Sequence, residues 1–463
     1  MSSPAKAMPS QIAGIVGAAN VVEDPRELAA YEVDGKRPTA AARPGTANEV
    51  AELVKLAVAE NLAVIPCGAR TKLGIGMTPS RYDLAIDMAR LDRVISHDPG
   101  DLTLSVESGI PNSKLASALA EHNQFLPLEV PFYDRATVGG TLSSGVDSPL
   151  RQLYGTPRDF VLGMEFVTGQ GELAKSGGRV VKNVSGYDLH KLFLGAIGSL
   201  GIITRVNFRT FPLPQRTATI LAAFRWANDA FEYNRAIQKS LLRPQAVEIL
   251  SPAAVSILGA AKRGKPLFAG HDSAWWVAVA AAGNDSVIER CGRELSAIAQ
   301  TADRDSLASF ELLKNDSQSR IWSAICELPA AILRVSRQAA IFRVSCLPKT
   351  FAGLCEGSDG IANKFSLRIV QAFRGVGVAY IALLPAQENL GAMPQLKQAC
   401  AAILDTSANW WKTGATIPWC PLEFKRDINV WGAPRQDFPL MQKVKQAFDP
   451  RSIFAPGRFA GGL

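Results

Sequence analysis

Residues 136–204 read ATVGGTLSSGVDSPLRQLYGTPRDFVLGMEFVTGQGELAKSGGRVVKNVSGYDLHKLFLGAIGSLGIIT, and this stretch decides the fold of the chain. Glycines recur in it, first as the pair Gly139-Gly140 and later at steps of three from Gly195 to Gly201. Runs rich in β-branched residues lie between them and predict buried strands. Glycine lets the backbone approach a large flat ligand and leaves N–H groups free to face phosphate. The stretch therefore predicts a nucleotide-cofactor site.

A second glycine-rich loop, PCGARTKLGIG at 66–76, follows the apolar run LAVI at 62–65. Its glycines permit tight turns, Thr71 supplies a hydroxyl, and Arg70 and Lys72 supply positive charge, which together suit a pyrophosphate. The loop lacks the Gly-Lys-Ser/Thr ending of a P-loop and the GxGxxG dinucleotide fingerprint. The loop taken alone is weak support for a phosphate site, and its pairing with the first stretch strengthens the prediction.

The two loops, in this order, resemble the FAD-binding domain of the vanillyl-alcohol-oxidase and p-cresol-methylhydroxylase (PCMH-type) flavoproteins. Within that family the likeness is nearest to the smaller FAD-binding subunits of bacterial glycolate oxidases. The stretches that carry the resemblance are IPCGARTKL at 65–73, ATVGG at 136–140, LYGTPRDFVLG at 153–163, GGRVVKNVSGYDLHKL at 177–192 and FAPGRF at 454–459. The resemblance is specific over about residues 40 to 215 and at the tail, and thin between them.

The resemblance implies FAD as the cofactor and two groups of residues around it. The expected cofactor-binding residues are, in the first loop, Pro66, Cys67, Gly68, Ala69, Arg70, Thr71, Lys72 and Leu73, and, in the second stretch, Thr137, Val138, Gly139, Gly140, Ser144, Gly145, Arg151, Tyr154, Gly155, Gly198, Gly201, Ile202 and Ile203. Family members with covalent flavin attach it to a His or Cys. Ala69 and Arg70 stand where a histidine would sit, so we expect non-covalent FAD, with Cys67 as the one residue that leaves attachment open.

The catalytic residues are not identified by the sequence. Related 2-hydroxy-acid dehydrogenases carry a histidine pair in the cap domain that holds a metal and the substrate. The chain has four histidines, and His271, the one expected in the cap, has no partner, so no metal site is predicted. Arginines that could hold a substrate carboxylate are Arg334, Arg337, Arg343, Arg368 and Arg374, without a choice among them.

Composition narrows the function classes. The net charge is +8, but the basic residues are dispersed rather than clustered with aromatics, so no nucleic-acid partner is expected. Seven cysteines without a CxxC pair predict free thiols, and they exclude an iron–sulfur cluster of the ferredoxin type in this chain. No apolar run is long enough for an integral membrane segment, and the N-terminus lacks the apolar core of a secretory signal, so we expect a cytoplasmic protein.

The predicted fold class is α+β, with a two-subdomain FAD-binding domain followed by a ferredoxin-like cap. Expected boundaries are an N-terminal arm at 1–43, the FAD-binding domain at 44–215, the cap at 216–430, and a C-terminal segment at 431–463 that returns to the FAD domain. The proline-rich stretch FPLPQ at 211–215 marks the junction. Helices are expected at 46–60, 111–122, 137–145, 184–193, 227–241, 252–260, 284–300 and 437–448, and strands at 62–65, 84–87, 93–96, 102–107, 160–168, 202–208, 217–225, 245–250 and 274–281.

Three functions stay open at this stage. In the first, the chain is an FAD subunit of a glycolate-oxidase-like complex that oxidises a 2-hydroxy acid and passes the electrons to a partner. In the second, it is an accessory FAD subunit that transfers electrons or acts as a scaffold without oxidising substrate. In the third, it is a stand-alone D-lactate-type dehydrogenase. The resemblance implies a larger FAD-containing catalytic subunit and an iron–sulfur subunit as partners. Through them the chain would lie near the inner face of the membrane.

Overall fold

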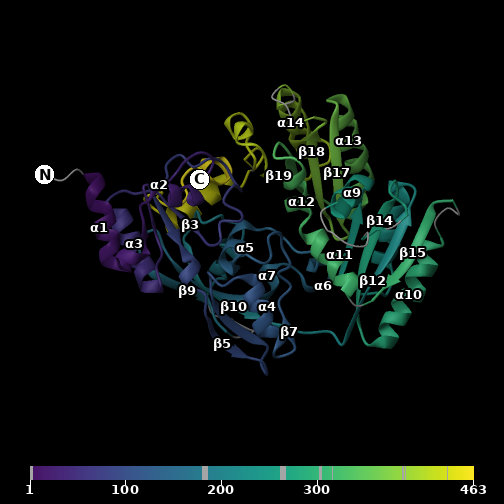
Figure 1. Ribbon diagram of the computed structural model, residues 1–463, viewed down its shortest axis with the longest axis horizontal. Helices are drawn as coiled ribbons and strands as arrows, with labels where there is room; N and C mark the ends of the chain where they lie inside the picture. The colour runs from purple at the N-terminus through teal and green to yellow at the C-terminus, as the bar shows by residue number, and fades with distance from the viewer. Residues whose placement is uncertain are drawn as a thin grey trace.

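The chain folds into two domains that lie side by side. The first domain is drawn purple to blue in Figure 1, and the second, the cap, is drawn teal to green. The computed structural model describes residues 4–179, 186–260, 267–268, 270–301, 305–314, 316–387, 391, 393–434 and 436–463. The α+β class predicted from the sequence is confirmed.

The first subdomain is a small mixed sheet with strand order β1-β2-β4-β3. Its strands are β1 (Val21–Val22), β2 (Ala40–Ala42), β3 (Val64–Cys67) and β4 (Leu84–Asp87), and its helices include α1 (Pro4–Val16), α2 (Pro25–Leu28) and α3 (Ala47–Ala59). Residues 1–43, expected as an arm, thus supply two strands, and Ile12 of α1 is fully buried against α3. Sequence reasoning missed these strands because two and three residues are too few for a visible alternation.

Helix α3 starts where its capping sequence predicts. The hydroxyl of Thr46 accepts a hydrogen bond from the backbone N–H of Glu49 at 3.1 Å. The Glu49 carboxylate in turn accepts from the N–H of Gly45 at 2.8 Å, one residue before the usual partner in a capping box. The buried face of the helix, which includes Leu53 and Val54, closes the core beneath β3 and so fixes the start of the first glycine-rich loop.

The second subdomain is an antiparallel five-stranded sheet with order β5-β6-β10-β8-β9. Its strands are β5 (Val94–Asp98), β6 (Thr103–Glu107), β8 (Val161–Val167), β9 (Leu173–Gly177) and β10 (Ile202–Arg209). Two further strands of two residues, β7 (Gln124–Phe125) and β11 (Phe211–Pro212), pair with each other outside this sheet. The helices are α4 (Asn112–Ala120), α5 (Val138–Ser144), α6 (Arg151–Tyr154) and α7 (Pro157–Phe160). Residues 184 and 185 of the helix expected at 184–193 lie outside the described residues, and the helical part of the remainder is a 3-10 turn at Leu189–Leu192.

The cap is built on one eight-stranded sheet with order β15-β12-β14-β13-β17-β18-β16-β19. Its strands are β12 (Arg216–Phe224), β13 (Ala246–Leu250), β14 (Trp275–Gly283), β15 (Leu307–Leu313), β16 (Ala340–Ser345), β17 (Leu367–Arg374), β18 (Val378–Pro385) and β19 (Gly414–Trp419). Each half has the 4-1-3-2 strand order of a ferredoxin-like unit, and β13 pairs with β17 to join the halves. The two ferredoxin-like halves expected from the sequence are present.

The two faces of the cap sheet have different coverings. One face packs against α8 (Ala227–Lys239), α10 (Asp285–Ala299), α13 (Phe351–Lys364) and α14 (Met393–Asn409). The other packs against α9 (Pro252–Ala260), α11 (Asp316–Cys326) and α12 (Leu328–Val335), and also against loops of the first domain through Ile75, Val146 and Ile197. The space between the domains is therefore walled by this second face.

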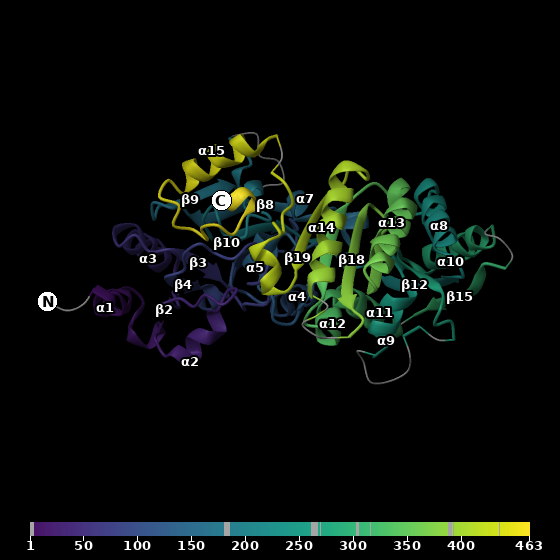
Figure 2. The same cartoon turned by 90° about the horizontal axis from the view of Figure 1, so that it is seen from above.

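The C-terminal segment returns to the first domain, as expected. Helix α15 (Phe438–Phe448) is followed by a tail that runs beside β3, where Val64 donates to Ile453 and Ala455 donates to Val64, each at 2.8 Å. Figures 1 and 2 show this yellow segment lying on the first domain rather than on the cap. In the described part of the chain, no helix is long and apolar enough to cross a membrane.

Candidate functional site

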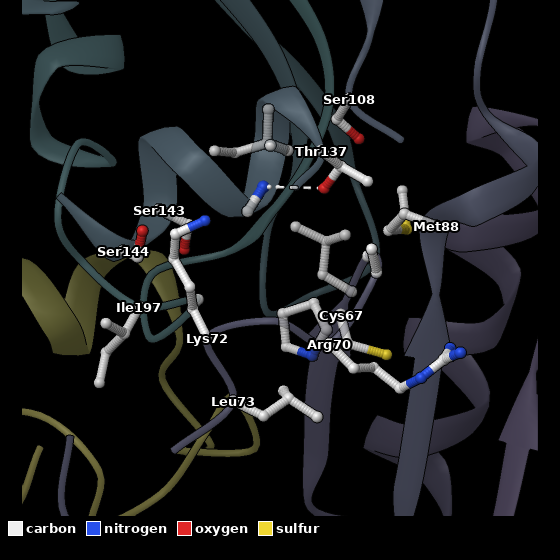
Figure 3. A pocket seen from close by; sticks show the side chains of 18 of the residues that line it. Cys67, Arg70, Lys72, Leu73, Met88, Ser108, Thr137, Ser143, Ser144 and Ile197 are labelled. Carbon is white, nitrogen blue, oxygen red and sulfur yellow. Dashed lines mark hydrogen bonds between the residues drawn. The ribbon is translucent and has the colours of Figure 1, made fainter. Parts of the chain in front are cut away.

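A cavity between the two subdomains of the first domain brings the two glycine-rich stretches together (Figure 3). Of the residues expected to bind the cofactor, those that line it are Pro66, Cys67, Gly68, Ala69, Arg70, Thr71, Lys72, Leu73, Thr137, Gly139, Gly140, Ser144, Gly198, Gly201, Ile202 and Ile203. Segments far apart in the sequence thus meet around one space, which we call the first cavity.

The loop at 68–73 presents unused backbone donors to the first cavity. No hydrogen bond of the described chain uses the N–H groups of residues 69–73. The loop is held instead through its carbonyl groups, because Lys72 accepts from Ile75 N–H at 3.1 Å and the Arg458 guanidinium donates to the carbonyls of Leu73 and Ile75. Successive free N–H groups form the kind of concave donor set that binds a phosphate.

The two basic residues of this loop have different surroundings. Arg70 adopts a left-handed backbone conformation with φ of 61°, forms an ion pair with Asp87 at 2.7 Å and stacks over the ring of Tyr31. Lys72 has no ion pair among the described residues, and Figure 3 shows it extended along the cavity. Burial lowers the pKa of Lys72 to about 8, opposed by the charge of Glu327. Lys72 is therefore the free cation of the loop, while Arg70 is already neutralised.

Helix α5 places two glycines on the cavity with different roles. The Thr137 side chain caps the helix by accepting from the N–H of Gly140 at 3.3 Å. A Cβ on Gly139 would lie 2.8 Å from the Cβ of Ser108, so this glycine is required by packing. A Cβ on Gly140 would meet only the Thr137 hydroxyl, at 3.1 Å, and would otherwise lie in open space. Gly140 thus leaves room in the cavity itself.

Five residues expected to bind the cofactor do not line the first cavity, namely Val138, Gly145, Arg151, Tyr154 and Gly155. Val138 is fully buried in the core of the second subdomain. Gly145, with φ of 64°, ends α5 and lines a second cavity. Arg151 pairs with Asp147, and the Tyr154 hydroxyl accepts from Gln245 of the cap at 2.7 Å. Their contact with the cofactor stays a prediction.

Sequence reasoning did not name the other residues that line the first cavity, which are Ile75, Met88, Ser108, Ser143, Ile197 and Arg458. Arg458 had a signal, because it belongs to the tail stretch 454–459 that carries part of the family resemblance. Met88 and Ser108 follow strands β4 and β6 and carry no local pattern that marks them.

The second cavity lies between the two domains and adjoins the first, with Ile75 and Ser144 lining both. On the side of the first domain it is lined by Ile75, Gly76, Ser144, Gly145, Val146 and Gly195. On the other side it is lined by Arg343, Tyr380, Thr416, Ile417, Pro418, Trp419 and Val430 of the cap and by Trp431 at the start of the C-terminal segment. Arg343 is the charged side chain among the described residues of this wall.

Arg343 and Tyr380 belong to a buried cluster of charged and polar side chains that joins the two domains. Asp147, in the loop after α5, accepts hydrogen bonds from Arg374 and Arg151, from the Tyr380 hydroxyl at 3.2 Å and from Arg343 Nη2 at 3.4 Å. Glu248 lies with its Oε1 2.9 Å from Nε of Arg374. We call Asp147, Arg151, Glu248, Arg343, Arg374 and Tyr380 the interdomain cluster.

Burial and charge act in opposite directions on the two acids of the interdomain cluster. Burial alone would raise the pKa of Asp147, but the guanidiniums of Arg374, Arg343 and Arg151 outweigh it and hold that pKa below its usual range. Burial raises the pKa of Glu248 to about 7, with Arg374 opposing the shift and Asp147 adding to it. Asp147 is therefore ionised at neutral pH, and Glu248 titrates near neutrality.

The remaining candidates named from the sequence have structural roles or lie apart. Of the cap arginines, Arg368 donates to the Pro385 carbonyl at 3.2 Å, and Arg334 lines a separate interdomain cavity. All seven cysteines are free, and no group of His, Cys, Asp and Glu among the described residues could hold a metal ion. His190 is buried with its Nδ1 3.1 Å from the Ser176 hydroxyl.

Two family profiles match the chain. The FAD binding domain matches residues 38–177, and the C-terminal domain of FAD linked oxidases matches residues 213–404 and 430–459. The second match includes the tail that carries Arg458, so the family pattern extends across the same discontinuous arrangement as the fold.

Curated relatives are similar at low identity. Glycolate oxidase subunit GlcD of Bacillus subtilis is 24% identical over 91% of this chain and 88% of its own length. D-2-hydroxyglutarate dehydrogenase of Xanthomonas citri is 32% identical over 45% of each chain. Glycolate oxidase subunit GlcE of Escherichia coli is 33% identical over 36% of this chain and 48% of its own. The latter two matches thus span about half the length of those relatives.

Solved structures share the fold. A 4-ethylphenol oxidase from Gulosibacter chungangensis and a p-cresol methylhydroxylase each align over 99% of this chain and 97% of their own, with a TM-score of 0.76 at 17% identity. The first cavity fits the cofactor of the matched domain, because it offers unused N–H groups, an unpaired Lys72 and a glycine-lined wall. The chain therefore belongs to the FAD-linked oxidases, as an oxidoreductase whose cofactor is FAD.

Proposed function

We propose that the chain is the FAD-binding subunit of a glycolate-oxidase-like complex, in which it oxidises a small 2-hydroxy acid to a 2-oxo acid and passes the electrons to a partner. The observation that carries the substrate class is Arg343, a guanidinium on the wall of a cavity that adjoins the FAD cavity. Guanidinium groups bind carboxylates through paired, charge-assisted hydrogen bonds. The names of the curated relatives, which include glycolate oxidase subunits and 2-hydroxy-acid dehydrogenases, support the same class.

The residues of this chain would divide the work as follows. The N–H groups of residues 69–73 and the Lys72 ammonium would hold the pyrophosphate of FAD. Arg343 would hold the substrate carboxylate, and the apolar side chains of Trp419 and Trp431 would exclude water from the same cavity. When bound, FAD supplies a two-electron acceptor for the C–H bond. The Tyr380 hydroxyl lies on this wall and is oriented by Asp147.

Anaerobic mixing of the purified, FAD-loaded chain with glycolate or D-lactate tests this function. We expect bleaching of the flavin absorbance, because the substrate would reduce the cofactor. An unchanged spectrum with both acids, in a protein that dithionite still reduces, would contradict substrate oxidation by this chain.

The accessory role is a second candidate, and a specific observation favours it. Oxidation of an alcohol needs a group to accept the hydroxyl proton. The described residues that line the second cavity include no carboxylate and no histidine. In the accessory role, the chain would transfer electrons as part of a complex with a larger FAD-containing catalytic subunit and an iron–sulfur subunit. This complex would lie in the cytoplasm at the inner face of the membrane. Gentle affinity purification from native cells should recover these partners; a lone polypeptide with full turnover would favour the stand-alone dehydrogenase.

We also propose that FAD is held without a covalent bond. Cys67 lines the first cavity, but burial raises the pKa of its thiol well above the ordinary value, which disfavours the reactive thiolate. Acid precipitation should release yellow colour into the supernatant. Flavin that remains in the protein pellet would show attachment.

A further inference from the structure

At the edge of the second cavity, the cap binds the side-chain carboxylate of Asp147 from the first domain. Asp147 is 4% exposed and accepts hydrogen bonds from three guanidiniums and one phenol. Two of these donors, Arg343 and Tyr380, also line the second cavity. A ligand held by Arg343 would therefore lie next to the negative charge of Asp147.

The charges of the interdomain cluster leave room for one more anion. Three guanidiniums, from Arg151, Arg343 and Arg374, face the two carboxyl groups of Asp147 and Glu248. One positive charge is left when both carboxyl groups are ionised. Buried charges need a partner, so a single ligand carboxylate would complete the balance, and a second would exceed it.

Arg343 is the group through which that spare charge reaches the cavity. Its side chain keeps 25% of its exposed surface, against 6% for Arg374, and its contact with Asp147 is at 3.4 Å. Of the three arginines, Arg343 is the one that lines the second cavity. Arg374 and Arg151 hold Asp147 more closely, so Asp147 stays in place when Arg343 turns to a ligand.

The rest of the second cavity offers no second charged partner to an acid group. Apart from Arg343, the described lining residues are uncharged, and the wall at 417–419 and 430–431 is largely apolar. A second carboxylate would therefore lie without a cationic partner, and either contact with the apolar wall or closeness to Asp147 carries an electrostatic cost.

We propose that Asp147 is a specificity-determining residue that restricts the second cavity to monocarboxylic 2-hydroxy acids and rejects dicarboxylic ones. It does so by neutralising part of the arginine charge and by placing a fixed negative charge beside Arg343. The inference rests on the proposed function, because it takes the second cavity as the substrate site. It narrows the substrate class to small acids of the glycolate and lactate type.

Binding of unreactive acids to the FAD-loaded protein tests the proposal separately from turnover. We expect wild-type protein to bind propionate at least about tenfold more tightly than malonate in equilibrium dialysis, since like charges at close range cost several kcal/mol in such sites. Malonate binding that equals or exceeds propionate binding in wild-type protein would overturn the proposal without any variant.

The variant Asp147→Asn keeps the shape of the side chain and removes its charge. We expect its malonate affinity to rise about tenfold or more, so that the preference for propionate is lost. Asp92→Asn is the matched control, because Asp92 forms an exposed pair with Lys114 and should leave both affinities unchanged. An unchanged ratio of affinities in Asp147→Asn, with FAD retained, would also overturn the proposal. If the variant loses FAD, the wild-type ratio decides alone.

Flavin bleaching by glycolate, D-lactate and D-2-hydroxyglutarate is then measured in the same proteins. It tests the proposed oxidation separately from the proposed role of Asp147. A selective binding site without bleaching would reject the proposed oxidation and leave the role of Asp147 standing. Bleaching by D-2-hydroxyglutarate as fast as by glycolate in wild-type protein would reject the role of Asp147 and leave the oxidation standing.

Discussion

The two adjoining cavities are built in different ways. The first is lined mostly by a few short continuous segments with glycines in each, and its unused donors include the N–H groups of one loop. The second takes its chemistry from side chains of Arg343 and Tyr380, which lie on neighbouring strands of the cap and are tied to Asp147 of the first domain. A backbone site suits a ligand shared by a whole family, whereas a side-chain site can change its ligand by single substitutions.

The largest effect is expected at Gly140. The variant Gly140→Val should lose FAD and still fold, because its side chain would enter open space in the first cavity and meet only the Thr137 hydroxyl. The measurement is the flavin-to-protein ratio after gel filtration, with circular dichroism to report folding. Gly360→Val, at an exposed position of α13 in the cap, is the control, since a Cβ there meets nothing within 4 Å. A folded Gly140→Val protein with full FAD content would remove α5 from the FAD site.

The next effect is expected at Arg343. Arg343→Gln should weaken binding of propionate about 100-fold, because removing one charged partner of a buried ion pair costs roughly 2–5 kcal/mol. The fold should persist, since Asp147 keeps Arg374 and Arg151. Arg368→Gln, also in the cap but bonded to a backbone carbonyl, serves as the control. Unaltered propionate affinity in Arg343→Gln would move the substrate site elsewhere while leaving the FAD site intact.

A smaller effect is expected at Lys72. Lys72→Met should weaken FAD about tenfold at pH 7, by loss of one charge-assisted contact. The Lys72 pKa of about 8 also sets a pH dependence: FAD affinity in wild-type protein should fall as the pH rises above about 8, because the amine loses its proton. Lys72→Met should lack this fall, whereas Lys55→Met, which removes an exposed pair with Glu52, should retain it. Parallel pH profiles in wild type and Lys72→Met would exclude contact between Lys72 and the phosphates.

The smallest effect concerns Glu248, whose pKa is raised by burial to about 7. Below that pH the neutral acid leaves an additional positive charge in the interdomain cluster, so propionate affinity should fall several-fold from about pH 6 to 8. The contribution of Glu248 to folding stability changes with pH in the same direction. Because burial raises its pKa in the folded protein, this contribution is present at low pH and is lost as the pH rises to about 7. Glu248→Gln should flatten the binding profile, and Glu52→Gln should not. A profile that keeps its slope in Glu248→Gln would assign the titration to another group.

The parts of the molecule that the sequence predicted are those set by neighbours along the chain. The helix after Thr46, the strand at 84–87 and the glycine turns of both loops follow from local sequence patterns, and the structure has them close to the expected places. The first cavity was predictable for the same reason, because most of its lining comes from two continuous stretches.

The parts that escaped prediction depend on partners far along the chain. Arg374 meets Asp147 across 227 positions, and no pattern around either residue marks the pair. Arg70 lines the first cavity, and its contacts with Asp87 and Tyr31 were not expected, because only the packing of the first sheet reveals them. The proposal of Arg343 from among the five cap arginines needed the register of the cap sheet, which places Arg343 opposite Tyr380.

The contact of Arg458 with Leu73 has a consequence for the order of events during synthesis. The two residues are 385 positions apart, so at about 5–20 residues per second the loop leaves the ribosome roughly 20–80 s before the arginine that holds it. During that interval the carbonyl groups of Leu73 and Ile75 lack their final donor. The first glycine-rich loop thus reaches its final hydrogen bonding only after the whole cap has been synthesised.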